Sequence, residues 1–104
     1  MYAREVSMQL KANSGSKFTR TIEKDILPIL RKQSGFADEL TFLAPEGKSA
    51  VAISFWDRKE SADRYERDTY PRVLTGLAAV VEGTPVVHAY DVSNSTFHKI
   101  AADK

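Results

Sequence analysis

The 104-residue sequence predicts one α+β domain, in which a four-stranded antiparallel sheet carries helices on one face. In four segments apolar and polar residues alternate with a period of two, or the segment is a short apolar run; both patterns are typical of strands. Two longer segments repeat apolar residues at intervals of three and four, as amphipathic helices do. Turn residues separate these segments in the order strand, helix, strand, strand, helix, strand. The length fits a single domain, expected to span residues 1–104.

The first half of the chain predicts a strand followed by a helix. Residues 2–10 alternate apolar and polar side chains, which is typical of a strand. The following segment has helical periodicity, with Ser16 as its predicted N-cap and Gly35 as its predicted end. Pro28 lies inside this helix and is predicted to kink or divide it, because proline lacks the backbone donor.

The second half predicts a hairpin, a divided helix and a last strand. Residues 36–57 are two apolar arms around the turn sequence PEGK. Asp57 is the predicted N-cap of the next helix, whose dense run of opposite charges is a solvated face. Pro71 is predicted to begin a second helical segment, with an apolar stripe that extends to Val81. Residues 84–95 return to a period of two.

Composition excludes several classes of function. The chain has no cysteine, which removes disulfides, thiolate metal sites and cysteine nucleophiles and suits a reducing cytoplasm. Its 15 basic and 14 acidic residues are interspersed, so nucleic acid is not an expected partner. No segment has the apolar length of a membrane helix, and the first residues lack a signal-peptide pattern. We therefore expect a cytoplasmic protein without membrane contact.

The element order β-α-β-β-α-β is that of the ferredoxin-like fold. Its helices cover one face of the sheet, yet both alternating sets of residues 50–56 are largely apolar. An uncovered sheet face with such side chains would leave an exposed apolar patch. A homodimer with two sheets packed face to face removes that patch, so we expect a homodimer. Which sheet face lines a cavity stays open at this point.

Four stretches carry a resemblance to a known family: ILPILRKQSGF, AISFWDRKESADRY, YPRVL and VVHAYDVSNSTFHK. Together they resemble the antibiotic biosynthesis monooxygenase-like family of dimeric α/β barrels. The resemblance implies a ferredoxin-like protomer with a cavity between the sheet and the helices. Some members oxidise aromatic quinols or phenols without metal or flavin, so no cofactor is implied. In such members a tryptophan that ends a strand lines the cavity, and Trp56 is the matching residue.

Binding of haem or metal has less support. Haem-degrading members use an asparagine on the first strand and a histidine on the helix after the tryptophan. Here the first strand offers Ser7 and Gln9 instead, and that helix contains no histidine. His88 and His98 are ten residues apart and have no clear third partner, so no metal site is expected.

Six residues are candidates for a site. Trp56 either packs in the core or forms the floor of a pocket for a planar ligand, with the small Ser54 leaving room beside it. Tyr65, Tyr70 and Tyr90 could hydrogen-bond a ligand hydroxyl, although aromatic residues at such spacings are more often core. His88 is the candidate catalytic base, although no carboxylate on its own strand face would orient it.

Two functions therefore remain open. The first is a cofactor-independent monooxygenase that binds a planar phenol or quinol near Trp56. The second is a non-catalytic ligand-binding or assembly module of the same fold. A cavity too small for an aromatic ring, or one filled by Phe36 and Tyr65, would favour the second.

Overall fold

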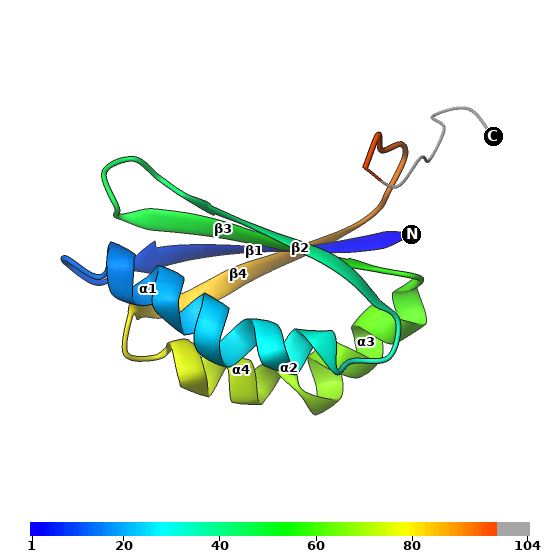
Figure 1. Ribbon diagram of the computed structural model, residues 1–104, viewed down its shortest axis with the longest axis horizontal. Helices are drawn as coiled ribbons and strands as arrows, with labels where there is room; N and C mark the ends of the chain where they lie inside the picture. Colours follow the sequence, from blue (N-terminus) through cyan, green and yellow to red (C-terminus); the bar gives the residue numbers. More distant parts are fainter. Residues whose placement is uncertain (98–104) are drawn as a thin grey trace.

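The computed structural model describes residues 1–97, which form an antiparallel sheet with helices packed on one face (Figure 1). The spatial strand order β2-β3-β1-β4 is that of the ferredoxin-like fold, so the predicted topology is confirmed. The predicted residue His98 lies outside the described residues. The strands are β1 (Tyr2–Leu10), β2 (Phe36–Leu43), β3 (Ser49–Trp56) and β4 (Val81–Asp91).

The first helical segment accommodates Pro28 through a wider helical turn. It consists of α1 (Gly15–Thr21), a π-helical turn η1 (Ile22–Ile26) and α2 (Leu27–Arg31). The N–H of Leu27 donates to the carbonyl of Ile22, five residues back. Because proline crowds the preceding turn and lacks a donor, a wider turn directly before it relieves both problems. The helical segment therefore changes its winding at the predicted position.

Both predicted N-caps are displaced. The N-cap of α1 is Ser14 rather than Ser16, and its side chain makes no capping hydrogen bond. The N-cap of α3 (Lys59–Asp68) is Arg58, one residue after Asp57. The Asp57 carboxylate instead accepts a hydrogen bond from the Ser61 side chain, which lowers its pKa.

The second helical segment ends earlier in the sequence than its apolar stripe suggests. Pro71 lies in the first turn of α4 (Tyr70–Leu77), as predicted. Val81, however, is the first residue of β4 rather than part of the helix. Both Leu77 and Val81 are buried in the same core, so one apolar run contributes to two elements.

Strand register separates the two faces of the sheet. Ala50, Ser54 and Trp56 of β3 are buried beneath the helices, whereas the odd-numbered residues between them face away. A bulge in β2 sets the register of its partner: Phe36 lies opposite Trp56, while Asp38 lies opposite Phe55. The even-numbered face of β3 is therefore the face that lines the interior.

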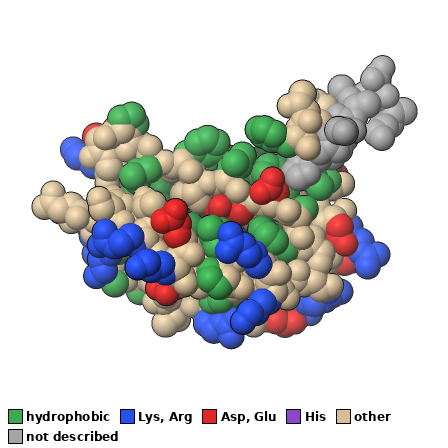
Figure 2. All heavy atoms as spheres, viewed as in Figure 1, with side chains coloured by type: hydrophobic (Ala, Val, Ile, Leu, Met, Phe, Trp, Pro, Cys, Tyr) green, Lys and Arg blue, Asp and Glu red, His purple; other side chains and the backbone are tan. Residues whose placement is uncertain are grey.

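The opposite sheet face is open and partly apolar. Phe42, Val86 and Tyr90 on this face are 55%, 54% and 53% exposed. Apolar side chains gather along this side of the molecule in Figure 2. Within residues 1–97, no helix is long and apolar enough to cross a membrane.

Candidate functional site

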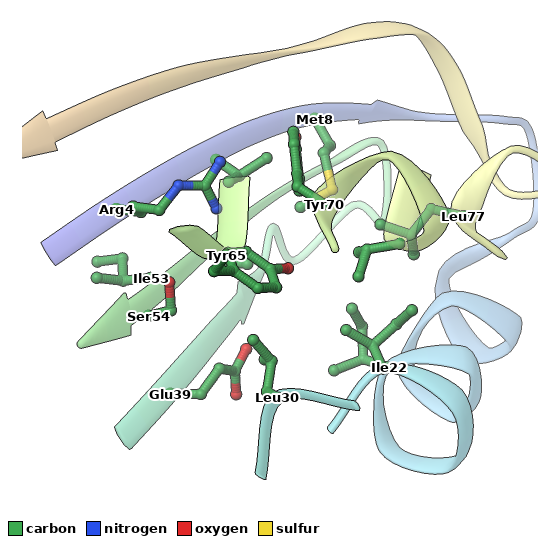
Figure 3. A pocket seen from close by; sticks show the side chains of 14 residues that line it. Arg4, Met8, Ile22, Leu30, Glu39, Ile53, Ser54, Tyr65, Tyr70 and Leu77 are labelled. Carbon is green, nitrogen blue, oxygen red and sulfur yellow. The ribbon is translucent and has the colours of Figure 1, made fainter. Parts of the chain in front are cut away.

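A cavity of about 40 Å³ lies between the sheet and the helices (Figure 3). Its polar lining comes from Arg4, Glu39, Ser54, Tyr65 and Tyr70. The rest of the wall is largely apolar and includes Val6, Met8, Ile22, Ile26, Leu30, Ala52, Val73 and Leu77. An apolar cavity with a few convergent polar groups is the usual form of a small-molecule site.

The floor of the cavity contains a row of three polar side chains, one from each of three neighbouring strands. Ser54 of β3 pairs with Arg4 of β1 on one side and with Glu39 of β2 on the other. Since strands lie about 4.8 Å apart, the Arg4 and Glu39 backbones are roughly 10 Å apart. The small Ser54 side chain leaves the space between them open. A positive and an acidic group therefore face the same cavity from opposite ends.

Arg4 is the most deeply buried charged side chain of this row. It is 3% exposed, and its Nη2 donates to Glu66 Oε1 over 3.1 Å. The Glu66 side chain itself is 56% exposed, so solvent weakens this ion pair. The guanidinium carbon lies 4.4 Å from the ring centre of Tyr70 and 5.1 Å from that of Tyr65. Two aromatic rings and one rim carboxylate thus surround the charge.

Glu39 is poised to take up a proton. Burial raises the pKa of this carboxyl above its ordinary value of 4.5, and the nearby charge of Asp38 raises it further. The Thr41 hydroxyl donates to the carboxylate and opposes part of this shift. A carboxylate whose pKa moves toward neutrality is better suited to act as a general base.

The same shift predicts a stability change. Because the folded-state pKa of Glu39 is raised, folding favours the protonated carboxyl, and ionisation above pH 4.5 costs stability. Glu39→Gln is therefore expected to increase the free energy of unfolding at neutral pH, with the gain vanishing as the pH falls below 4.5. Urea denaturation across this pH range measures the effect. A variant that is less stable than the parent at neutral pH would contradict the prediction.

The two tyrosines of the cavity are hydrogen-bond donors at neutral pH. Burial raises the pKa of Tyr65 to about 12. Burial also raises the pKa of Tyr70, although the nearby charge of Arg4 opposes this shift. Both phenols therefore stay protonated, and the acidic group available as a base in this cavity is Glu39.

Trp56 occupies the core behind the cavity. Its ring is fully buried, and its Nε1 donates to Ser54 Oγ over 2.9 Å. Phe36 meets it edge-on at 5.6 Å between ring centres, and Tyr65 lies against it at 5.0 Å. A ligand in the cavity would therefore meet Tyr65, which covers the indole.

The structure divides the six predicted site residues. Ser54, Tyr65 and Tyr70 line the cavity, with Trp56 directly behind Ser54 and Tyr65. His88 pairs with Glu5 and Tyr90 pairs with Ala3, both on the open face of the sheet. His88 and Tyr90 are thus separated by the sheet from the other four.

Sequence reasoning overlooked Arg4 and Glu39. For Arg4 a signal existed, since it is the charged member of an alternating set with Tyr2 and Val6. For Glu39 the simple alternation misleads, because the bulge brings Phe36 and Glu39 to the same face although they are three residues apart.

The fold and the cavity define a class: a ferredoxin-like α+β protein with an apolar site between sheet and helices. No sequence-family model matches the chain, and no curated protein matches it. Solved structures with this fold include the cofactor-independent oxygenase SnoaB from Streptomyces nogalater. That similarity has a TM-score of 0.74 at 13% identity and covers 91% of this chain and 95% of SnoaB. The resemblance to antibiotic biosynthesis monooxygenases is confirmed at the level of the fold.

Two further structures show the range of proteins with this fold. NE2512 of Nitrosomonas europaea, of unknown function, matches with a TM-score of 0.75 at 12% identity over 91% of each chain. The ActVA-Orf6 monooxygenase of Streptomyces coelicolor, in complex with nanaomycin D, matches with a TM-score of 0.71 at 14% identity. That match covers 90% of this chain and 88% of the enzyme.

Proposed function

We propose that the protein oxidises a small planar phenol or quinol with dioxygen in the cavity beneath the helices, without a cofactor. The observation that carries this proposal is the pairing of Arg4 and Glu39 across one apolar cavity. The pair combines a proton acceptor with a fixed positive charge, an arrangement that the sequence did not reveal. The similarity in fold to SnoaB and ActVA-Orf6 is consistent with this chemistry.

In the proposed reaction, Glu39 removes a proton from the substrate. The electron-rich anion then passes electrons to dioxygen, and a carbon–oxygen bond forms to give a peroxide. Cleavage of the O–O bond, with loss of the proton from the same carbon, leaves a carbonyl and releases water. The substrate supplies all the electrons, one oxygen atom enters the product and the other leaves in water. The apolar walls orient the substrate and exclude solvent.

Oxygen uptake tests this proposal. We would supply hydroquinones, naphthoquinols and an anthrone, and subtract the uptake measured without protein. Glu39→Gln is expected to lower the protein-dependent rate by roughly 10²- to 10⁴-fold, the usual contribution of a general base. Glu46→Gln changes an exposed carboxyl in the β2–β3 turn and serves as the matched control. Equal rates for Glu39→Gln and the parent would refute the assignment of Glu39.

Two observations favour the second candidate, a binding module without catalysis. The cavity of about 40 Å³ is well below the roughly 150 Å³ of an engineered cavity that binds benzene. The rings of Phe36 and Tyr65 already pack against Trp56. An aromatic ligand therefore requires movement of the lining side chains. Saturable binding without oxygen uptake above background, for every compound of the panel, would favour this candidate.

We also propose that two copies pair through the open sheet face. This proposal is supported by the exposed apolar side chains Phe42, Val86 and Tyr90. Val86→Glu is expected to convert a dimer of 11.6 kDa chains into monomers, because it places a charge in the packed face. Thr75→Glu, on the exposed side of α4, is the control. Light scattering that shows the parent as a monomer at all concentrations would exclude this pairing.

A further inference from the structure

We propose that Arg4 and Tyr70 form an oxyanion-binding site, so that a phenol binds in the cavity as its phenolate. This inference rests on the proposed function, because it concerns the same cavity. It adds the form in which the ligand is recognised and the side chains that hold its oxygen. It also assigns a role to Glu66, at the rim of the site.

The first support is a pair of buried polar atoms without well-placed partners. Among residues 1–97, Arg4 Nε and Tyr70 Oη are buried and neither has a partner in good hydrogen-bond geometry, although Arg4 lies close enough to the Tyr70 hydroxyl to oppose the rise of its pKa. Nearly all buried polar groups in folded proteins are hydrogen-bonded, so such exceptions call for an explanation. Both residues line the cavity, and in Figure 3 the Arg4 guanidinium projects toward Tyr70. A ligand oxygen that accepts hydrogen bonds from both would satisfy these atoms together.

The second support is the sign of the charge. A guanidinium only donates hydrogen bonds and stays positive at all ordinary pH values. Arg4 is 97% buried (3% exposed), so it cannot be fully hydrated and needs a negative partner. Its ion pair with Glu66 leads outward, since the Glu66 side chain is more than half exposed. The buried side of the guanidinium is therefore matched to an anion rather than to a neutral carbonyl.

The charges around the site determine how the anion arises. Glu39 faces the cavity across Ser54 and can take the phenolic proton. Glu66 approaches Arg4 from the rim and competes with any second anion for the guanidinium. Tyr65 and Tyr70 border the charge as neutral groups. Loss of the Glu66 charge should therefore strengthen phenolate binding, while loss of the Arg4 charge should abolish it.

A matched pair of probes separates anion binding from general apolar binding. 4-Nitrophenol ionises and its phenolate absorbs visible light, whereas 4-nitroanisole has the same ring but cannot ionise. At one pH unit below the pKa of free nitrophenol, the protein is expected to increase the phenolate absorption. Hydrogen bonds to charged groups predict that nitrophenol binds roughly tenfold to a hundredfold more tightly than the anisole.

Three variants test the residues. Arg4→Met is expected to remove both the phenolate absorption and the preference for nitrophenol, and Arg4→Lys is expected to retain part of each. Glu66→Gln is expected to bind nitrophenolate more tightly than the parent, a gain that a merely structural role would not produce. Arg72→Met, on the exposed side of α4, is the control and should behave as the parent does. Circular dichroism verifies that each variant is folded.

The inference is overturned if the parent binds both probes equally, binds neither, or shows the same phenolate absorption after Arg4→Met in a folded protein. These outcomes do not depend on turnover. Phenolate binding without oxygen uptake would leave the inference intact and remove the proposed function. Oxygen uptake without a preference for the phenolate would do the reverse.

Discussion

Gly35→Ala is expected to destabilise the protein by roughly 2–5 kcal/mol, from strained backbone and steric overlap together. Gly35 has a φ of +83°, a conformation that L side chains rarely adopt. A Cβ at this position would lie 2.3 Å from Ser61 Oγ and 2.4 Å from Asp57 Oδ1. The Gly35 carbonyl also accepts a hydrogen bond from the Asp57 N–H at 2.8 Å. This hydrogen bond joins the loop after α2 to the start of α3.

Gly47→Ala is the matched control for this variant. Gly47 has a similar φ of +75°, but nothing lies within 4 Å of an added Cβ. Its substitution should cost only the backbone strain, about 1–2 kcal/mol. The difference between the two variants in urea unfolding isolates the steric contribution. Equal losses of stability would show that Ser61 and Asp57 move aside freely.

Trp56→Ala is expected to lower the free energy of unfolding by about 3–5 kcal/mol, the range for large aromatic side chains removed from a core. The indole is fully buried, contacts Phe36 and Tyr65, and donates to Ser54. Its removal leaves a large void and an unsatisfied hydroxyl at the edge of the cavity. Chemical denaturation of the variant and the parent measures the loss.

Fluorescence of the single tryptophan provides an independent test of the same packing. A fully buried indole emits at shorter wavelength than a hydrated one. The native parent, in which Trp56 is fully buried, should therefore emit at short wavelength, and the emission should shift to longer wavelength on unfolding. For the stability measurement on Trp56→Ala, the control is Phe97→Ala, which removes an aromatic ring that is 74% exposed. Emission typical of a hydrated indole in the native protein would contradict the core position of Trp56.

The order of elements could be predicted because it depends on local patterns. The alternation of residues 2–10, the helical spacing up to Gly35 and the turn at PEGK each lie within a short window of sequence. Pro28 and Pro71 also act locally, and both mark changes in helical winding or helix starts. Ser54 and Tyr65 were expected at a site, and they do line the cavity.

The capping predictions failed at both helix starts for a local reason. Asp57 is a good N-cap by residue type, but its carboxylate accepts a hydrogen bond from Ser61 and the helix begins after Arg58. The residue type shows which side chains can cap a helix. It does not show at which residue the helix begins, and therefore which backbone N–H groups are free to be capped. Ser14 and Ser16 differ by half a turn, a shift that the sequence pattern does not resolve.

The sequence by itself determined the α+β class, the number and order of the strands and the amphipathic helices, because hydrophobic periodicity records burial within each element. Only the tertiary structure decided which residues meet. Strand pairing brings Arg4, Ser54 and Glu39 into one row, and the bulge in β2 turns Glu39 inward. The same pairing places His88 on the opposite face. Register depends on contacts between distant strands, and a one-residue shift reverses the face of every following side chain.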